Sequence, residues 1–589
     1  MTDYFEVHAR DGAARVGELR LETPRTTPAL VDDVVSDAGS LWAADREVPA
    51  GDESTLTVLP HRAFPGGTAP EVRQSFAVDH PDVDYPSVAV VSSEGASEQG
   101  TDAYLVSDAG SVMGHGAALV EAVVTVREAI PADTALYFSG VATPRNVATL
   151  AYAGVDLFDA AKAVVKGTQG KYLTAEGEYY LEDLEELPCA CPACRKPREE
   201  FTREDCAEHN ENALRAQLAT VRRRIRDGRL RDYLEGQARH EQWLTAAMRT
   251  LDDQWGYLEE RTPILRESEL NAATEDTLRR VEIQRFADRV TTRYRNRFSN
   301  PLVLAPCSAK KPYSESQSHK QFHDAIRWRA HLVSMTSPIG VVPQELETTY
   351  PAQHYDTVVT GRWSEDEKGF VAEVLRRYLE RNADAYPYVV AHVPDEGYRE
   401  IVERVEESWD GDLDVTYTVP EGGHPTDEEA LANLSSALSG ELKYSKRERE
   451  HNTVRAIADY LLGDGAGDEL FDEIRTTSRY PKIQVRDAED TQLATMVPQY
   501  GTLSFTLEGA KRWVESDAPV KRVEIDGFVP HGSVLAPGVV DADEEIRVGD
   551  EVVVEGPKAF GVGRAEMFGR EMAESTRGIA AEIRHVEER

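Results

Sequence analysis

Short apolar segments alternate with amphipathic ones along much of this chain, and the alternation limits which folds it can adopt. Residues 117–128 and 146–152 have the spacing of helices, and residues 134–138 and 155–159 read as buried strands. Strands that alternate with helices form βα units, which build largely parallel sheets. A second α/β series opens at residues 301–306 and runs to about residue 419. The chain is therefore predicted to be an α/β protein.

The chain of 589 residues is too long for one hydrophobic core. Its first hundred residues read as short strands, and a turn-rich linker with a helix start covers residues 420–429. The tail from about Pro519 reads as a small β-barrel. Helices are predicted at residues 204–234, 239–257, 275–295, 453–462 and 468–475. A multidomain protein follows.

The apolar segments are all short. No window approaches the eighteen or so consecutive apolar residues of a membrane span, and the N-terminus lacks the pattern of a signal peptide. The chain has only five cysteines, and an odd number cannot all pair, which argues against a disulfide framework. We therefore expect no membrane partner and a reducing, cytoplasmic location.

The formal net charge of −39 argues at first against a nucleic-acid partner, because proteins that bind phosphates are usually basic. The acidic residues, however, are spread along the whole chain, and Lys is scarce beside Arg. Such a surface keeps a protein hydrated in concentrated salt. The overall sign then says little about ligands, and local basic clusters carry more information.

Four of the five cysteines fall within eighteen residues. Cys189, Cys191 and Cys194 lie on a turn that contains proline, and Cys206 and His209 follow near the start of a long helix. Three thiolates and an imidazole make a four-ligand set suited to a closed, structural zinc site. Cys206 is a less favoured substitute ligand. A reduced turn of small buried residues is the alternative.

The segment that contains these cysteines resembles the tRNA-guanine transglycosylase family from about Leu136 to Arg295. The resemblance rests on Gly154-Val-Asp-Leu-Phe-Asp159, on Gly170-Lys-Tyr-Leu-Thr-Ala-Glu-Gly and on the order of the Cys and His residues. It implies a (β/α) barrel of TIM type. It also implies zinc at Cys189, Cys191, Cys194 and His209, and Asp159 as the residue that matches the family's nucleophile.

Two departures separate the chain from an active transglycosylase. The family's base-binding motif Asp-Ser-Gly-Gly-Phe-Gln is missing, and the nearest text is Ser107-Asp-Ala-Gly-Ser. Only 158 residues precede Asp159, whereas seven βα units of about 30 residues would need roughly 210. We therefore expect a shortened barrel in which Asp159 is a relic nucleophile.

A second cluster of reactive side chains follows the apolar strand at residues 302–305. Lys310 and Lys311 follow Cys307 within four residues, and His319 lies twelve residues after Cys307. Nearby positive charge favours a thiolate, which makes Cys307 a candidate nucleophile, and His319 is a candidate proton carrier. A buried cysteine beside a phosphate-binding lysine loop fits the composition equally well. Hydroxyls that could orient a substrate belong to Ser308, Tyr313, Ser316 and Ser318.

The same segment resembles the central motif of the archaeosine synthase family. That motif is Pro-Cys, three residues, Lys-Pro-Tyr, two residues, Ser, two residues, His, and every fixed position is present from Pro306 to His319. The resemblance continues in three further segments, at residues 340–347, 350–356 and 453–514. Within the family, the chain resembles the alpha subunit of the haloarchaeal type. The resemblance implies a transferase that adds an amine to the nitrile of 7-cyano-7-deazaguanine at position 15 of tRNA, forming an amidine.

The tail resembles a PUA domain, an RNA-binding β-barrel, in the segments 533–539, 546–554, 562–565 and 577–580. Its glycine-rich turns would let the backbone approach a phosphate, although an ordinary turn-rich barrel is the alternative. The helix after the zinc ligands carries a run of arginines that is either an RNA-binding stripe or a solvated face. The candidate RNA-binding residues are Arg222, Arg223, Arg226, Arg229, Lys558 and Arg564.

These expectations combine into one architecture. It has a degenerate transglycosylase-like barrel with zinc at 1–298 and a central α/β catalytic domain at 299–440. A small α+β domain at 441–518 and a PUA β-barrel at 519–589 follow. The resemblance implies lysine as amine donor, with glutamine or ammonia as alternatives, and it allows a radical-SAM partner protein and a homodimer. Base exchange in tRNA and a non-catalytic tRNA-binding scaffold are the competing functions.

Overall fold

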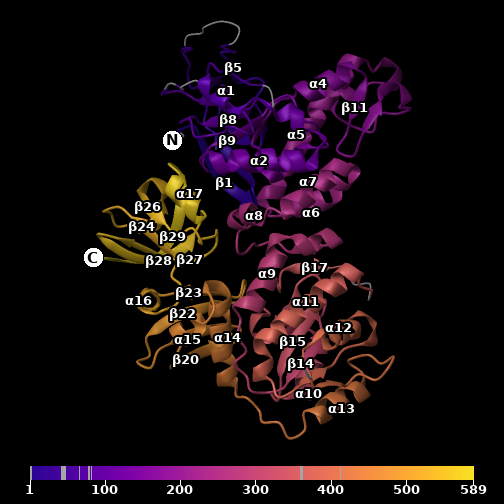
Figure 1. Ribbon diagram of the computed structural model, residues 1–589, viewed down its shortest axis with the longest axis vertical. Helices are drawn as coiled ribbons and strands as arrows, with labels where there is room; N and C mark the ends of the chain where they lie inside the picture. Colours follow the sequence, from indigo (N-terminus) through magenta and orange to yellow (C-terminus); the bar gives the residue numbers. More distant parts are fainter. Residues whose placement is uncertain are drawn as a thin grey trace. The chain divides into compact units, whose positions relative to one another are not determined.

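The computed structural model describes residues 3–41, 48–64, 67–76, 80, 82–357, 362–410 and 413–589. The chain forms two compact units (Figure 1). The first contains residues 1–263, 533–548 and 566–580, and the second contains 264–532, 549–565 and 581–589. Among the described residues, no helix is both long enough and apolar enough to cross a membrane.

The first unit is built around a seven-stranded sheet in which all neighbouring strands run parallel. Its order is β4-β10-β9-β8-β7-β6-β5, so the edge strands β4 and β5 are consecutive in the chain. The five residue steps from Leu30 to Val35 span at most about 18 Å, whereas six strand spacings in a flat sheet cover about 29 Å. The sheet must therefore curl. Its strands are β4 (Ala29–Leu30), β5 (Val35–Asp37), β6 (Leu56–Val58), β7 (Ser87–Val91), β8 (Ala103–Val106), β9 (Ala135–Phe138) and β10 (Leu157–Phe158).

The barrel is short because it lacks helices. Helices α1 (Pro70–Ser75), α2 (Gly116–Ala129) and α3 (Val147–Ala153) precede β7, β9 and β10. In the parts of the chain that the structure describes, the connections before β5, β6 and β8 contain no α-helix. The predicted shortened barrel is confirmed. An antiparallel sheet of β1 (Phe5–Asp11), β2 (Ala14–Leu19) and β3 (Arg25–Thr27) precedes it.

Two of the predicted helices are each divided into two shorter ones. The segment predicted as one helix at 204–234 is α5 (Arg203–Arg226) and α6 (Leu230–Gln237), because Gly228 between them has φ +62° and turns the chain. The segment 239–257 gives α7 (Gln242–Asp252) and α8 (Trp255–Arg261). Helix α9 (Val281–Thr292) is shorter than its predicted range of 275–295.

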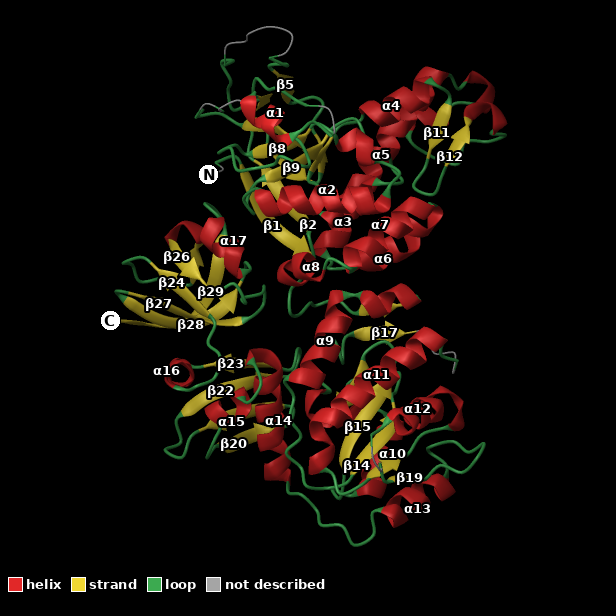
Figure 2. Cartoon of the chain, in the orientation of Figure 1, coloured by secondary structure: helices red, strands yellow, loops and turns green. Residues whose placement is uncertain are grey.

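The second unit contains a three-layer α/β/α arrangement (Figure 2). Its sheet has the order β16-β15-β14-β18-β19, and only β16 runs antiparallel to its neighbour. Alternate residues of β14 face opposite layers: Leu302 and Leu304 pack with α9, α11 and α12, and Val303 and Ala305 pack with α10 and α13. The elements are β14 (Leu302–Pro306), α10 (Gln317–Ile326), β15 (His331–Thr336), β16 (Gly340–Pro343), α11 (Glu365–Asn382), β18 (Val389–Ala391), α12 (Glu400–Ser408), β19 (Val415–Tyr417) and α13 (Glu428–Ala437).

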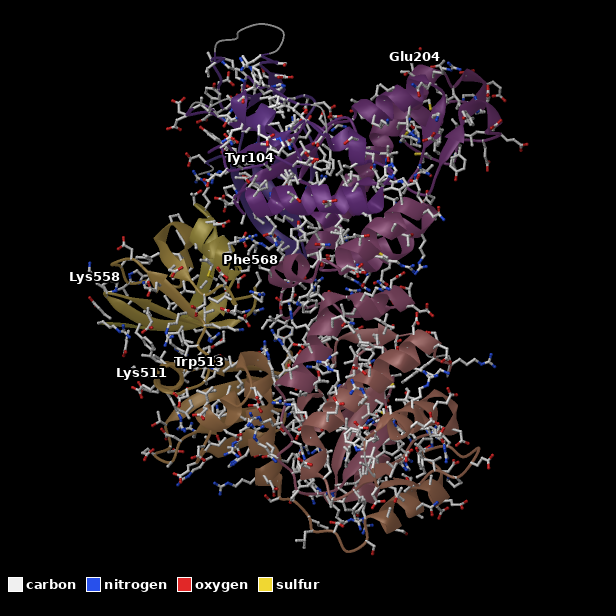
Figure 3. All side chains as sticks on the ribbon, viewed as in Figure 1. Tyr104, Glu204, Lys511, Trp513, Lys558 and Phe568 are labelled. Carbon is white, nitrogen blue, oxygen red and sulfur yellow. The ribbon has the colours of Figure 1, made fainter. Side chains whose placement is uncertain are left out.

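An antiparallel meander follows, backed by the buried helix α14 (Lys446–Leu462). Its strands are β20 (Arg475–Arg479), β21 (Lys482–Arg486), β22 (Gln492–Val497) and β23 (Thr502–Phe505). The helix predicted at 468–475 is wrong in its second half, because α15 (Ala466–Leu470) ends early and a strand begins at Arg475. Trp513 of α16 (Leu507–Glu515) is fully buried and stacks on Phe505 (Figure 3).

The tail is β-rich as predicted. In the second unit, β27 (Glu551–Gly556) pairs with β24 (Arg522–Ile525) and with β28 (Ala559–Ala565), and β28 pairs with β29 (Ile579–Glu588). The strands β25 (Ser533–Leu535) and β26 (Val539–Ala542) and the helix α17 (Gly569–Glu574) group with the first unit.

Candidate functional site

Cys307 lies directly beyond the carboxyl end of β14, in the middle of the five-stranded sheet. From β14 the chain passes through α10 to β15 on one side, whereas β18, on the other side, leads through α12 to β19. The helices α10 and α12 cover opposite faces. The strand order therefore reverses beside β14, and such reversals are where open α/β sheets bind ligands.

The half-buried thiol of Cys307 contacts a phenol. Its Sγ lies 3.2 Å from the hydroxyl oxygen of Tyr398, which sits on a helical turn (Asp395–Arg399) after β18. The ring of Tyr398 packs at 4.5 Å on that of Trp363. Burial and then the charge of Cys307 raise the pKa of Tyr398 well above its usual value. The phenol therefore keeps its proton and can donate a hydrogen bond to sulfur.

Two lysines follow Cys307 closely in the sequence, and the half-buried one is Lys311. Its Nζ lies 3.8 Å from the centre of the Tyr355 ring, a cation–π distance. Burial lowers the pKa of Lys311, and the charges of Cys307 and Asp356 oppose that shift. Lys310, in contrast, is 60% exposed and pairs with Glu315 at 3.2 Å.

A chain of hydroxyls runs behind the thiol. The hydroxyl of Tyr355 lies 2.6 Å from that of Tyr313 and 2.7 Å from Oγ1 of Thr336 at the end of β15. Burial, followed by the charge of Cys307, raises the pKa of Tyr313. Both phenols stay protonated, and their hydrogen bonds tie the loop after β14 to the end of β15.

His319 is fully buried near the start of α10. Its two ring nitrogens lie 3.2 Å from Oγ of Ser316 and 3.0 Å from Oγ of Ser334, and its ring stacks on Tyr313. Burial lowers its pKa to about 3, so the imidazole is neutral near neutral pH. Ser316 also caps α10 by accepting a hydrogen bond from the backbone N–H of His319. These contacts hold the loop between Cys307 and α10 in place.

The sequence motif spans Cys307 to His319, whereas Thr336, Trp363 and Tyr398 lie outside it and were not predicted. Tyr398 lies 91 residues beyond Cys307 and belongs to no motif. Only the fold brings it to the thiol.

A second cluster contains the predicted metal ligands. One ligand atom each from Cys189, Cys191, Cys194 and His209 lies within 4.8 Å of all the others. His209 is buried on α5, which begins at a capping box formed by Thr202 and Asp205. Cys206 is buried but lies outside this cluster. The four predicted ligands are therefore brought together.

The surroundings of the cluster fit a metal ion. The Nε2 of His209 lies 2.9 Å from the carbonyl oxygen of Leu173, which leaves Nδ1 to face the sulfurs of Cys194 and Cys191 at 3.3 and 3.6 Å. Tyr172 stacks on the imidazole at 3.7 Å. Histidines that bind metal ions usually donate their other ring N–H to such a carbonyl, which fixes the orientation of the ring.

Asp159 lies at the carboxyl end of β10 in the first unit. Its Oδ2 accepts hydrogen bonds from the hydroxyl of Tyr137 at 3.2 Å and from the backbone of Gly140 at 2.8 Å, and Oδ1 accepts one from Ala161. Burial, together with the charge of Asp159, raises the pKa of the neighbouring Asp32. Asp159 is buried and well bonded, and Cys307 belongs to the other unit.

The predicted RNA-binding residues differ in exposure. Arg223 and Arg226 are exposed on α5, and Lys558 is exposed on the turn between β27 and β28 (Figure 3). Arg222 is half-buried and donates to the carbonyl of Pro28 at 2.5 Å, and Arg229 pairs with Asp232. Arg564 is half-buried in β28.

Four family models match the chain. They are the queuine tRNA-ribosyltransferase model at residues 83–242, a domain of unknown function at 283–438, the patch-forming domain C2 of tRNA-guanine transglycosylase at 452–519, and the PUA domain at 521–586. Cys307 lies within the model of unknown function.

Similar proteins are found among archaea. The chain is 68% identical over its full length to the archaeosine synthase of Haloferax volcanii and 41% identical to the archaeosine synthase subunit alpha of Methanosarcina acetivorans, each match covering 100% of both chains. It is 27% identical to the tRNA-guanine(15) transglycosylase of Methanobrevibacter smithii, over 80% of this chain and 69% of the other. On this evidence the chain belongs to the archaeosine synthase family.

Proposed function

We propose that this chain is a tRNA-modifying transferase of archaeosine biosynthesis that adds an amine to the nitrile of 7-cyano-7-deazaguanine at position 15 of tRNA. Family membership supports the biosynthetic role. The contact of the Cys307 thiol with Tyr398, at the reversal of strand order beside β14, is the observation that carries the amidine-forming step.

The reaction needs a nucleophile for a nitrile carbon, which is a soft electrophile. The thiolate of Cys307 attacks this carbon, and the nitrile nitrogen takes up a proton, which gives a thioimide. The amine then attacks the same carbon, the sulfur leaves as thiolate, and the amine nitrogen loses a proton to give the amidine. Every atom of nitrile and amine is retained.

The surrounding residues supply charge, protons and position. Lys311 favours the thiolate by its charge, and Tyr398 donates a hydrogen bond to sulfur. Lys310, which is exposed, would contact a phosphate of the tRNA. Tyr313 and Ser316 order the loop. The proton-carrier role of His319 is a hypothesis, and its contacts and low pKa favour a positioning role instead.

The partners follow from the same proposal. The substrate is tRNA, and lysine is the favoured amine donor, with glutamine or ammonia as alternatives. A radical-SAM protein would complete the conversion to archaeosine, and a homodimer is compatible with the family. Zinc at Cys189, Cys191, Cys194 and His209 would hold the fold and takes no part in the step.

Base exchange at Asp159 is the second candidate. Its support is the position of Asp159 at the carboxyl end of a barrel strand, and the missing base-binding motif counts against it. Incorporation of labelled guanine into tRNA would favour base exchange over amine addition.

The test is turnover of tRNA that carries the nitrile base, with lysine as donor, followed by mass spectrometry of the nucleoside. We expect Cys307→Ser to abolish amidine formation and Cys206→Ser, which alters a buried cysteine elsewhere, to retain it. Retained turnover in Cys307→Ser would overturn the covalent mechanism, and no consumption of lysine by the unchanged protein would favour a non-catalytic scaffold.

A further inference from the structure

A cavity of about 240 Å³ lies within the second unit, away from the residues assigned to the reaction. Its walls come from the end of α14, from β23 and from the first residues of β27, with Ile264 and Leu265 closing one side. Most of these side chains are apolar. The cavity is smaller than the roughly 300–1,000 Å³ of sites for drug-sized ligands, so it would hold a ligand the size of a single base.

Four charged residues line this apolar space, namely Asp550, Glu551, Arg564 and Arg584. Glu551 and Arg564 face each other directly across the pairing of β27 with β28. One carboxylate oxygen of Glu551 accepts hydrogen bonds from the backbone N–H of Phe505 at 2.8 Å and from Arg584. Within the described residues, its other oxygen accepts none, and the buried Nε of Arg564 has no hydrogen-bond partner.

The backbone keeps these groups open to the cavity. Gly549 has φ +94°, and a Cβ at this position would lie 3.1 Å from a side-chain carbon of Ile264 and 3.8 Å from the guanidinium of Arg564. A side chain here would be strained by the backbone angle, and its Cβ would press against Ile264. Glycine therefore preserves both the turn and the space.

The ligand that satisfies this arrangement must be flat and largely apolar, and it must carry adjacent donors and an acceptor on one edge. A guanine-type edge has these groups: its ring N–H and exocyclic amine can donate to a carboxylate, and its carbonyl can accept from arginine. A buried donor left without a partner destabilises a site, so a ligand that pairs with Nε of Arg564 gains specificity as well as affinity.

We propose that this cavity binds one unstacked guanine-type base of the tRNA, with Glu551 accepting from its donor edge and Arg564 donating to its carbonyl. The inference rests on the proposed function, which makes tRNA the substrate. Single-stranded RNA bases are commonly recognised in this way, by apolar contact with their faces and hydrogen bonds to their edges.

The test uses the full chain and guanosine 5′-monophosphate as probe, with adenosine 5′-monophosphate as comparison, in equilibrium dialysis. We expect binding of the guanosine nucleotide at least about tenfold tighter than of the adenosine nucleotide, and displacement by tRNA. Glu551→Gln should weaken it by about tenfold or more, whereas Glu508→Gln, at an exposed pair with Lys511, should not. Ser504→Met, which fills the cavity without removing a charge, should also weaken it.

Three results would overturn the proposal: no binding of the guanosine nucleotide by the folded protein, equal affinity for both nucleotides, or unchanged binding by folded Glu551→Gln and Ser504→Met. Displacement of the nucleotide by free lysine instead of tRNA would assign the cavity to an amino acid. Dialysis needs no turnover, so a protein that binds the nucleotide but forms no amidine contradicts the proposed function and leaves the cavity proposal standing.

Discussion

Cys307 is flanked by a half-buried ammonium group and a protonated phenol. The charge of Lys311 acts through a partly desolvated space, where Coulomb interactions exceed those in bulk water. Tyr398 acts through one hydrogen bond to sulfur at 3.2 Å. The covalent mechanism that we propose for Cys307 depends on both groups.

Tyr398→Phe should slow alkylation of Cys307 by iodoacetamide about tenfold at neutral pH. The change removes the only atom of the side chain that donates to sulfur, and a hydrogen bond to a charged group contributes about 1.5–3 kcal/mol. Tyr417→Phe is the control, because its hydroxyl donates to Glu406. An unchanged alkylation rate with an unchanged Tm would show that the phenol does not stabilise the thiolate.

Glu282 illustrates a charge retained in the core for stability. Burial raises its pKa, but the charges of Arg266 and Arg280 outweigh burial and lower it to about 2. A folded pKa below the ordinary 4.5 means that the stabilisation is present above pH 4.5 and is lost as the pH falls through 2.

Glu282→Gln should therefore lower the free energy of unfolding by about 3–5 kcal/mol at pH 7, because two buried guanidinium groups lose the negative charge of Glu282. The difference in the free energy of unfolding between the variant and the unchanged protein should narrow from pH 4.5 to pH 2. Urea denaturation at both ends of this range measures it. A gap that is the same at pH 7 and at pH 3 would contradict the account.

The sequence predicts the site residues that lie close to Cys307 in the chain and misses those that only the fold brings near it. Cys307, Lys311 and Tyr313 stand within seven residues and could be found together. Tyr398 could not, because a single tyrosine after β18 has no local signal. The residue type of His319 suggests proton transfer, but its burial between two serines appears only in the structure.

Among the secondary-structure elements, the cysteine turn and α5 form one assembly. The turn supplies three thiols, and α5 supplies His209 about two turns after its N-cap residue Thr202. Asn210 on the same helix holds the strand β11 (Lys171–Leu173) through hydrogen bonds to the backbone of Leu173 and Lys171. Loss of a bound ion would therefore disturb the turn, the helix start and the strand together.

Purified protein should contain about one zinc ion per chain, measured by elemental mass spectrometry. Cys194→Ser should lose most of the metal and lower the Tm, because structural zinc contributes directly to folding. Cys206→Ser is the matched control and should keep the metal, since Cys206 lies outside the cluster. Equal zinc content in both variants would contradict the ligand assignment.

The elements show why the barrel was predicted in outline only. The buried strands β7, β9 and β10 and the helices α2 and α3 follow their apolar patterns closely. The two- and three-residue strands β4 and β5 carry too few residues for any periodicity, so their role at the two edges of the sheet could not be foreseen. The break at Gly228 depended on a backbone angle that a helical pattern hides.

For the whole molecule, the net charge of −39 comes from 105 acidic residues against 66 lysines and arginines. Of the predicted RNA-binding residues, Arg226 and Lys558 are exposed, and Arg223 is exposed but pairs with Asp227. Arg222 donates to a backbone carbonyl, and Arg229 pairs with Asp232. Recognition of tRNA should therefore depend on shape and base contacts more than on many phosphate contacts.

The logarithm of the tRNA affinity should fall with the logarithm of the salt concentration with a slope of about −2 to −3, as expected for about three phosphate contacts. Arg226→Gln should reduce the slope by about one, and Arg376→Gln, a surface arginine paired with Glu373, should leave it unchanged. A slope of about −6 or steeper would show that bulk charge dominates.

The four-domain division at residues 298, 440 and 518 stays a prediction. Contacts divide the described chain into two units that separate at residues 263 and 264, so α9 groups with the central α/β sheet, not with the barrel. The tail contributes segments to both units. Sequence patterns locate elements, but they do not show which core a connecting helix joins.

The central claim is that Cys307 forms a covalent thioimide with the nitrile. Intact-protein and peptide mass spectrometry, after incubation with nitrile-modified tRNA without an amine and then nuclease digestion, tests it most directly. The account predicts an adduct on the peptide that contains Cys307, with no group lost from the nitrile, and its disappearance on addition of lysine. Amidine formation at full rate with no adduct at Cys307 under any condition would contradict it.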